Sequence, residues 1–256
     1  MALRTRTFLA AGGALVAALV VTGCGSGSAE SDDKEPETRA FALSGKTKTL
    51  TVDADDSDIE IAPADVKQLE VTRWFSGWTA LGEDPEVTWA LDGSTLMLRT
   101  ECDALVSGCA VKHRIKVPRG VVVKVEGDNG DVVASGFDNK LTVRSDNGDV
   151  TVEDVSGELE VKTDNGDLRV SGATSTRVAA RSDNGDVRLA LTKVPGRVET
   201  STDNGDLTVE LPRAAYKVTA ESDNGDVDVK VDRSEASAHV VTARSDSGEV
   251  TVRSAN

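Results

Sequence analysis

The sequence is poor in aromatic residues, histidine and cysteine. Of 256 residues, 38% are hydrophobic but only 3% are aromatic, two are histidine and three are cysteine. So few rings exclude a bulky globular interior, because aromatic side chains usually dominate the buried area of such a core. His113 and His239 lie far apart, so no Ser/His/Asp catalytic set can be assembled from them. We expect each to be a strand or surface residue rather than a ligand.

Positive charge is also scarce. The chain has 29 Lys and Arg against 44 Asp and Glu, which gives a net charge of −15. Such a protein repels phosphate backbones, so no nucleic-acid partner is expected, and cations or cationic partners are the natural ligands. Alternating Val and Leu over most of the chain argue against disorder.

One hexapeptide, [Ser/Thr]-Asp-Asn-Gly-Asp-[Val/Leu], organises the chain. It begins at Ser145, Thr163, Ser182, Thr202 and Ser222; a variant begins at Gly127 and a worn copy at Ser245. The spacings between motif glycines are 18, 18, 19, 20, 20 and 23 residues. The glycines are Gly130, Gly148, Gly166, Gly185, Gly205, Gly225 and Gly248. A self-similar unit near 20 residues is typical of a stacked-repeat protein.

Each repeat predicts a strand, a D-N-G-D corner and a second strand. Leu141, Val143 and Ser145 fall on one face of a strand, and Val150 and Val152 return to that face after the corner. We therefore predict an all-β fold in which residues 119–256 form a single-stack β-solenoid, like a parallel β-helix or β-roll. Residues 41–118 are less regular and predict a β-rich N-terminal cap, starting with a degenerate repeat at residues 55–61.

The cap region holds all three tryptophans. They are Trp74, Trp78 and Trp89. An open end of a stack needs bulky side chains to close it, so we expect these rings in the core of the cap. The second interpretation is a carbohydrate-stacking platform made by Trp74 and Trp78.

An antiparallel β-meander or sandwich is the alternative fold, because Asn-Gly between alternating runs is also a strong hairpin signal. A two-residue hairpin would place Asp146 directly opposite Asp149, and like charges opposed across strands destabilise. In a solenoid, identical segments stack about 4.8 Å apart, so inward hydroxyls and corner Asn side chains form ladders. We prefer the solenoid. Its stacked carboxylates repel each other and need backbone N–H donors or a cation.

The solenoid prediction specifies where the two Asp residues of each motif lie. The first Asp of each motif should lie on one line along one edge of the protein, and the second Asp on a parallel line beside it. The predicted first line is Asp128, Asp146, Asp164, Asp183, Asp203 and Asp223, and the second is Asp131, Asp149, Asp167, Asp186, Asp206 and Asp226.

Residues 1–23 predict a lipoprotein signal peptide. Arg4 and Arg6 precede an apolar run of signal-peptide length that ends in Val21-Thr22-Gly23-Cys24. This end resembles the bacterial lipobox, which implies cleavage before Cys24 and its acylation. The alternative is an ordinary secretory peptide. Residues 24–40 form an acidic Gly/Ser linker. We expect an extracytoplasmic protein whose membrane partner is reached through a lipid anchor on Cys24.

The other two cysteines, Cys102 and Cys109, form an even pair in an oxidising compartment. We expect a disulfide that closes a short loop. The six residues between them fit neither a zinc knuckle nor a Cys-x-x-Cys redox pair.

The corner motif has three chemical interpretations. The first is turn chemistry, in which Asp and Asn bind their own backbone, Gly adopts a positive φ, and no cofactor is needed. The second is a calcium ladder formed by the twelve Asp residues of the two lines, although the doubled glycines of toxin-type calcium repeats are absent. The third is a polysaccharide-active enzyme whose acids are flanked by Arg144, Arg181 and Arg244.

The repeated strand–hexapeptide–strand units resemble a bacterial family of unknown function whose members are described as adhesins. The Leu50-Thr-Val start and the Ile115-Lys-Val-Pro-Arg-Gly segment carry the same resemblance, which covers about residues 45–253. The resemblance implies a β-solenoid at the cell envelope or surface and carries no catalytic residues. We expect a non-enzymatic, adhesin-like binding or structural module, whose cell-wall or extracellular ligand is unknown.

Overall fold

The computed structural model describes residues 35–44, 47–81, 85–102 and 106–255, with the backbone alone for residues 78–81 and 106–107. The predicted signal peptide, Cys24 and most of the linker lie outside the described residues. In the part that is described, the regular elements are β-strands. No helix within these ranges is long and apolar enough to cross a membrane.

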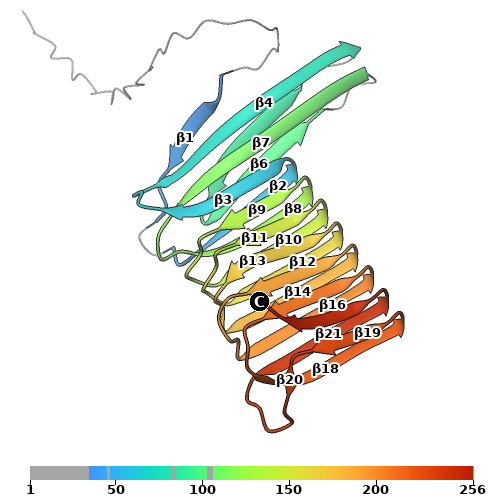
Figure 1. Ribbon diagram of the computed structural model, residues 1–256. Coiled ribbons are helices and arrows are strands. Elements are labelled where there is room, and N and C mark those ends of the chain that lie inside the picture. The colour runs from blue at the N-terminus through green and yellow to red at the C-terminus, as the bar shows by residue number, and fades with distance from the viewer. Residues whose placement is uncertain (1–34, 45–46, 82–84, 103–105, 256) are drawn as a thin grey trace, which may run out of the picture. The chain divides into compact units, whose positions relative to one another are not determined.

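Each repeat forms one coil of a solenoid (Figure 1). In one repeat, β10 (Leu141–Asn147) runs to the corner and β11 (Val150–Glu153) runs away from it. In the next repeat, β12 (Leu159–Asn165) and β13 (Leu168–Ala173) pair with them in parallel, and Asn147 faces Asn165. The solenoid prediction is confirmed. The antiparallel alternative is wrong for the repeats, because like residues stack on like.

The coils build two sheets of eleven strands each. Sheet B holds the strands that approach the corner, and sheet A holds those that leave it. In sheet B these are β8 (Val122–Asn129), β10, β12, β14 (Arg177–Asn184), β16 (Arg197–Asn204), β18 (Ala215–Asn224) and β21 (Val240–Ser247). In sheet A they are β9 (Val132–Ser135), β11, β13, β15 (Val187–Leu191), β17 (Leu207–Leu211), β19 (Val227–Lys230) and β22 (Val250–Ser254).

The core is a thin layer of aliphatic side chains between the sheets. Leu141, Val143, Val150 and Val152 are at most 1% exposed, while Thr142 and Thr151, which alternate with them, point outward. Each buried Val or Leu stabilises the fold by about 1.5–3 kcal/mol. The strict alternation therefore fixes which face of each strand turns inward, since a one-residue slip would expose the whole set.

The stack begins before residue 119. The predicted degenerate repeat is a coil made of β2 (Thr49–Asp56) and β3 (Asp58–Ala64), which pair in parallel with β8 and β9. A further coil consists of β6 (Thr95–Glu101) and the C-terminal half of β7 (Val106–Pro118). Antiparallel strands close this end: β1 (Glu37–Phe41), β4 (Leu69–Leu81) and β5 (Glu86–Asp92).

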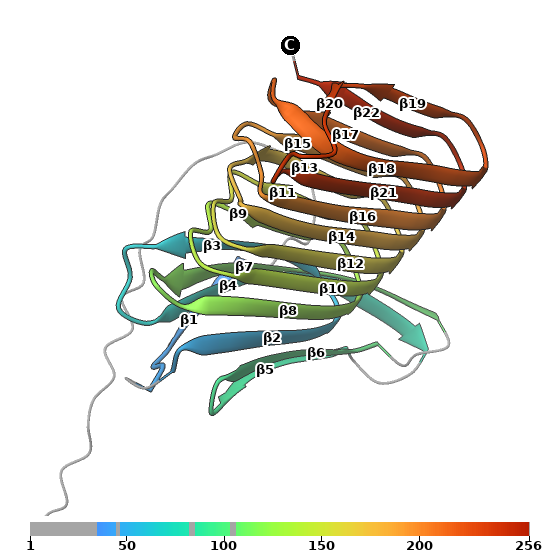
Figure 2. The ribbon, with the colours of Figure 1, turned by 90° about the horizontal axis from the view of Figure 1, so that it is seen from below.

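The order of coils in space differs from the order in the chain at both ends of the stack. Coil β2–β3 lies between β6–β7 and β8–β9, and the last coil, β21–β22, lies between β16–β17 and β18–β19 (Figure 2). Asp246 therefore stands between Asp203 and Asp223, which corrects the predicted line of first Asp residues. Each outermost coil is consequently tethered by chain at both of its ends, so it cannot peel away from a free terminus.

The N-terminal end is closed by Trp89, which is only 5% exposed. The guanidinium groups of Arg39 and Arg73 lie 4.8 and 4.6 Å from its ring centre, and Phe41 meets it edge-on at 6.4 Å. The expectation of a cap-core tryptophan holds for this ring. Trp74 is instead half-buried, with the guanidinium of Arg114 5.0 Å from its ring. The side chain of Trp78 lies outside the described set.

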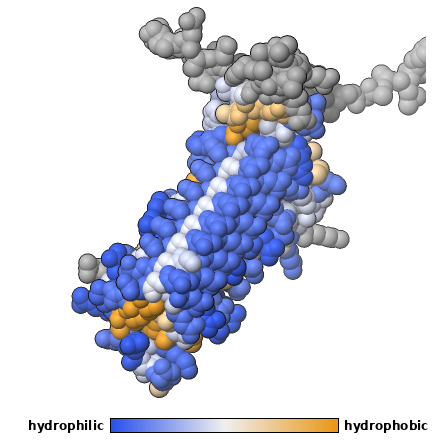
Figure 3. Space-filling view, turned by 90° about the vertical axis from the view of Figure 1, so that its right-hand side faces the viewer, coloured by the Kyte–Doolittle hydropathy of each residue, from blue (hydrophilic) through white to orange (hydrophobic). Residues whose placement is uncertain are grey.

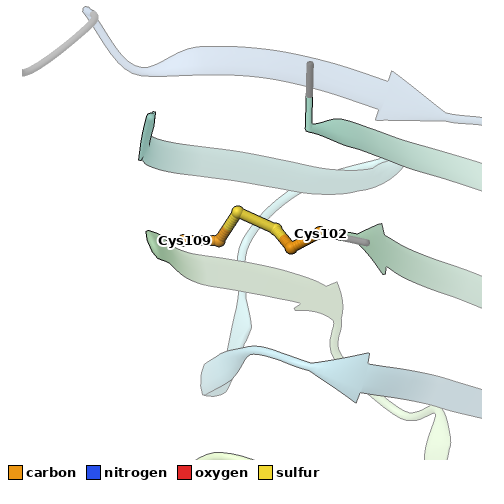
Figure 4. The surroundings of a disulfide bond; sticks show 2 residues. All are labelled: Cys102 and Cys109. Carbon is orange, nitrogen blue, oxygen red and sulfur yellow. A yellow bond between two sulfur atoms is a disulfide. The ribbon is translucent and has the colours of Figure 1, made fainter. Parts of the chain in front are cut away.

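A disulfide joins Cys102 and Cys109, with their Cα atoms 6.5 Å apart (Figure 4). It crosslinks the connection from β6 to β7. In this coil a covalent link thus stands where the repeats from β8–β9 onward have the hexapeptide or a variant of it.

His113 is fully buried in β7, beside Trp89 at 6.3 Å between ring centres. Neither ring nitrogen has a hydrogen-bond partner among the described residues. Burial, and then the charge of Arg73, lowers the pKa of His113 to about 4. The ring is therefore a neutral residue of the core, carried on strand β7.

This histidine predicts a loss of stability in mild acid. The unfolded chain binds a proton near pH 6.5, whereas the folded chain does not until about pH 4. Above pH 6.5, His113 therefore does not lower the free energy of unfolding. As the pH falls from 6.5 towards 4, the unfolded state gains a proton that the folded state does not, and the free energy of unfolding decreases by about 3 kcal/mol. Urea unfolding of the wild type and of His113→Leu from pH 7.5 to 4 measures it. We expect a shallower pH dependence in the variant; parallel curves would contradict the assignment.

Candidate binding surface

The corner asparagines form a ladder along one edge of the stack. Asn147 Nδ2 donates to Asn129 Oδ1 at 3.0 Å, and Asn165 donates to Asn147 in the same way. The ladder continues through Asn184 and Asn204. Each amide therefore holds the coil beside it, which predicts the same residue at the same place in successive repeats.

The corner glycines allow the coils to approach closely. Gly166 has a φ of +149°, and a Cβ atom on it would lie 2.2 Å from the carbonyl oxygen of Gly148. Gly148 has the same relation to Gly130. Two separate constraints, backbone conformation and the neighbouring carbonyl, thus require glycine at this position.

The inward hydroxyls of the motif bind these same carbonyls. Ser182 Oγ donates to the Gly166 oxygen at 3.1 Å, and Thr202 Oγ1 donates to the Gly185 oxygen at 2.9 Å. A hydroxyl at this position is buried, so it needs such an acceptor. Ser145 alone among these buried hydroxyls finds no partner in the described ranges.

From Asp131 to Asp206, the second Asp of the motif accepts a backbone N–H from the neighbouring coil. Asp149 N donates to Asp131 Oδ1 at 2.9 Å, and Asp167 N donates to Asp149 Oδ1 at 2.8 Å. The series continues through Asp186, Asp206 and Glu249. Backbone donors therefore offset the repulsion along this line of carboxylates.

Lysine and arginine side chains offset the first line. Lys162 forms ion pairs with Asp164 and with Asp183 in the next coil, and its hydrogen bond to Asp164 raises its pKa. Arg181 pairs in the same manner with Asp183 and Asp203, both at 2.9 Å. For Asp164, Asp183 and Asp203, the offsetting cation is thus supplied by the chain itself.

Arg144 and Arg244, expected to flank a polysaccharide site, also lie in ion pairs. Arg144 contacts Glu160 at 3.8 Å and Arg244 contacts Glu221 at 3.0 Å. Arg144, Arg181 and Arg244 therefore all have acidic partners on neighbouring strands. All three also line one hollow on the outer face of sheet B.

The twelve Asp residues suggested as calcium ligands lie in two lines. Among the described residues, no group of three or more His, Cys, Asp or Glu side chains is placed to hold a metal ion. The protein donors described above contact three residues of the first line and five of the second, from Asp131 to Asp206. Figure 3 views the stack from this side: between its two ends the surface is hydrophilic apart from one pale line that runs along the stack.

The outer face of sheet B is the surface that the corner chemistry leaves accessible. Its outward side chains stand in rows, because every strand is in register with the next. One row reads Arg144, Lys162, Arg181, Ser201 and Arg244, and the next reads Glu160, Ala179, Glu199 and Thr242. The short side chains of Ala179 and Ser201 leave a hollow of about 440 Å³ between the longer charged ones.

The stacked coils, self-supporting corners and capped end define a β-solenoid of the toast-rack type. The chain belongs to the Toastrack DUF4097 family, whose model matches residues 44–256. No curated protein matches the sequence significantly.

Three solved structures are similar. A candidate adhesin from Bacteroides fragilis is 15% identical, with a TM-score of 0.56 over 87% of this chain and 98% of that one. It shares the fold. A candidate cell adhesion protein from Clostridium sporogenes is 13% identical, with a TM-score of 0.39 over 88% and 100%. A candidate lipid-binding protein from Parabacteroides distasonis is 14% identical, with a TM-score of 0.41 over 85% and 97%.

The two constraints on the corner glycine can be separated by substitution. Gly120→Ala adds a Cβ in open space at a φ of +85°, so it should cost about 1–2 kcal/mol from the backbone alone. Gly166→Ala adds the clash with Gly148, and we expect a loss at least twice as large. Denaturant unfolding of both variants measures this. Equal losses would show that close approach of the coils is unimportant.

The contacts at the corners also predict that removing metal ions does not change the stability of the protein. EDTA and added calcium should leave the melting temperature unchanged, because backbone N–H groups and cationic side chains already contact eight of the twelve carboxylates. Asp167→Asn keeps an oxygen acceptor for the Asp186 N–H and should change stability by less than about 1 kcal/mol. A calcium-dependent rise in melting temperature that Asp167→Asn abolishes would instead establish a metal site.

Proposed function

We propose that this chain is a lipid-anchored, extracytoplasmic, non-enzymatic module that binds or supports other surface components, as an adhesin does. The anchor on Cys24 rests on the lipobox-like sequence and the Gly/Ser linker that follows it. A protein of the same fold from Bacteroides fragilis is described as a candidate adhesin, and the proposal gives this chain the same kind of role.

The observation that carries the proposal is that two sets of residues in each coil have different roles. The hexapeptide side chains hold neighbouring coils together, whereas the outward residues of sheet B vary from coil to coil. Such rows repeat at the strand spacing of about 4.8 Å, over the length of the stack. A long surface of this kind suits an extended polymer better than a small molecule, and the net charge of −15 favours a cationic one.

A binding role also fits the chemistry of the two histidines. His113 is enclosed in the core, where no substrate reaches it. His239 Nδ1 lies 2.8 Å from the carbonyl oxygen of Pro195, and its ring packs against Tyr216. Both rings thus contribute to packing.

Bacteria that display the full chain test the proposal. We expect them to be retained on an immobilised amine-bearing glycan, less on an anionic glycan, and progressively less as salt is added. Cys24→Ala should release the protein from the membrane fraction and abolish retention of the cells.

A pair of charge variants locates the surface. Glu160→Lys with Glu199→Lys on the outer face of sheet B should reduce retention at least several-fold. The matched pair Glu153→Lys with Glu210→Lys on sheet A should leave it unchanged. The proposal fails if displayed wild-type protein gives no retention on either glycan, or if both pairs of variants behave alike.

A further inference from the structure

The two ends of the stack differ in whether their hydrophobic core is covered. Trp89 and antiparallel strands close the N-terminal end, whereas coil β18–β19 ends the other side with its inward residues uncovered. Val227 is 44% exposed, although its equivalents in the two coils beneath, Val250 and Leu207, are fully buried. A hydrophobic region at this end is visible in Figure 3. Its partly buried aliphatic residues are Val218, Ala220, Val229 and Val231.

The strand edges at this end are also free. Within the described residues, β19 ends sheet A and pairs only with β22. The outer edge of β18 is covered only at Ala215–Tyr216, by the short strand β20 (Asp232–Arg233). Lys217–Asn224 therefore presents unpaired backbone groups beside exposed aliphatic side chains. This combination is a template for a further strand.

The sequence of β19 is complementary to itself. With the next residue it reads Val227-Asp228-Val229-Lys230-Val231, with the valines on the inward face. In an antiparallel pair centred on Val229, Asp228 faces Lys230 of a second copy, and Lys230 faces Asp228. Opposite charges directly across an antiparallel pair stabilise it. The valines then meet valines on the inner face.

Strand β18 can pair with its own counterpart about the two-fold axis that relates the two copies of β19. Counted from the corner, Ser222 and Val227 are the first inward residues, so Ala220 stands level with Val229. A two-fold axis through Ala220 and Val229 places Lys217 opposite Asp223 of the second copy. These residues all lie beyond the part of β18 that β20 covers. Both sheets can thus continue across one axis with opposite charges paired.

We propose that the open end of the stack binds a second copy of this chain, tail to tail about that two-fold axis. Strands β18 and β19 each pair antiparallel with their own counterparts, so both eleven-stranded sheets continue through the interface. The other end of the stack does not offer an equivalent pair of edges, because there the sheets end on the antiparallel cap strands β1 and β5. A closed two-fold contact also explains how an acidic protein with exposed edges avoids open-ended fibres.

Charge variants of the detergent-solubilised full chain test the interface by sedimentation equilibrium. We expect a dimer for the wild type. Lys230→Asp places like charges across the axis twice, so it should weaken association at least tenfold. Adding Asp228→Lys swaps both charges, keeps their complementarity and should restore the dimer. A wild type that stays monomeric, or a dimer that Lys230→Asp leaves unchanged, would overturn the proposal.

Crosslinking tests the register independently of affinity. Val229→Cys places two cysteines on the axis, directly opposite each other, so mild oxidation should give an intermolecular disulfide. Asp228→Cys faces Lys230 of the second copy rather than itself and should crosslink far less. Unfolding curves check that each variant is folded. Equal crosslinking at both positions, or none at Val229→Cys in a sample that sediments as a dimer, would contradict the proposed axis.

Discussion

The structure depends on one constraint: at the corner, each residue must stack on its equivalent in the next coil. The Asn ladder joins amide to amide at 3.0 Å, and each motif glycine passes the carbonyl of the one before it too closely for any side chain. A change in one repeat therefore affects two neighbours. This explains why the hexapeptide is nearly invariant within the chain, while the second corner varies in length and the outward residues vary in type.

The same constraint creates the electrostatic problem that the rest of the edge resolves. Stacking identical motifs places carboxylates in line at the strand spacing, where they repel. The two lines are stabilised differently. Residues of the second line accept a backbone N–H, as Asp149 does, whereas Asp183 and Asp203 of the first line meet Lys162 or Arg181 from the coil before. These ion pairs are half-exposed, so each contributes little stability. Their effect is to reduce the repulsion between the stacked carboxylates.

Most of the coil could be predicted from the sequence, because alternation and corner chemistry are local signals. The stacking of Asn147 on Asn165 and the inward hydroxyls follow from the repeat itself. The exchange of coils at both ends could not be predicted, since Ser222 and Ser245 begin motifs that fit equally well on the coil of Thr202. The burial of His113 was missed for a similar reason, because its place between inward Val111 and Ile115 was the only signal.

At the C-terminal end, the order of the last two coils in space is the reverse of their order in the chain. The repeat that comes last in the chain, β21–β22, is internal, and the repeat before it, β18–β19, is outermost. The worn copy, with Ser247 and Glu249, is inside the stack, and Asn224 of the intact copy donates to the backbone of Asp246 instead of to an amide. An outermost coil has one neighbour fewer, so it would be expected to tolerate substitution first. Yet β19 keeps the valines at both inward positions, although Val227 is 44% exposed. Aliphatic residues at an edge with unpaired backbone are a liability for a monomer, and their presence there is physically consistent if that edge is covered.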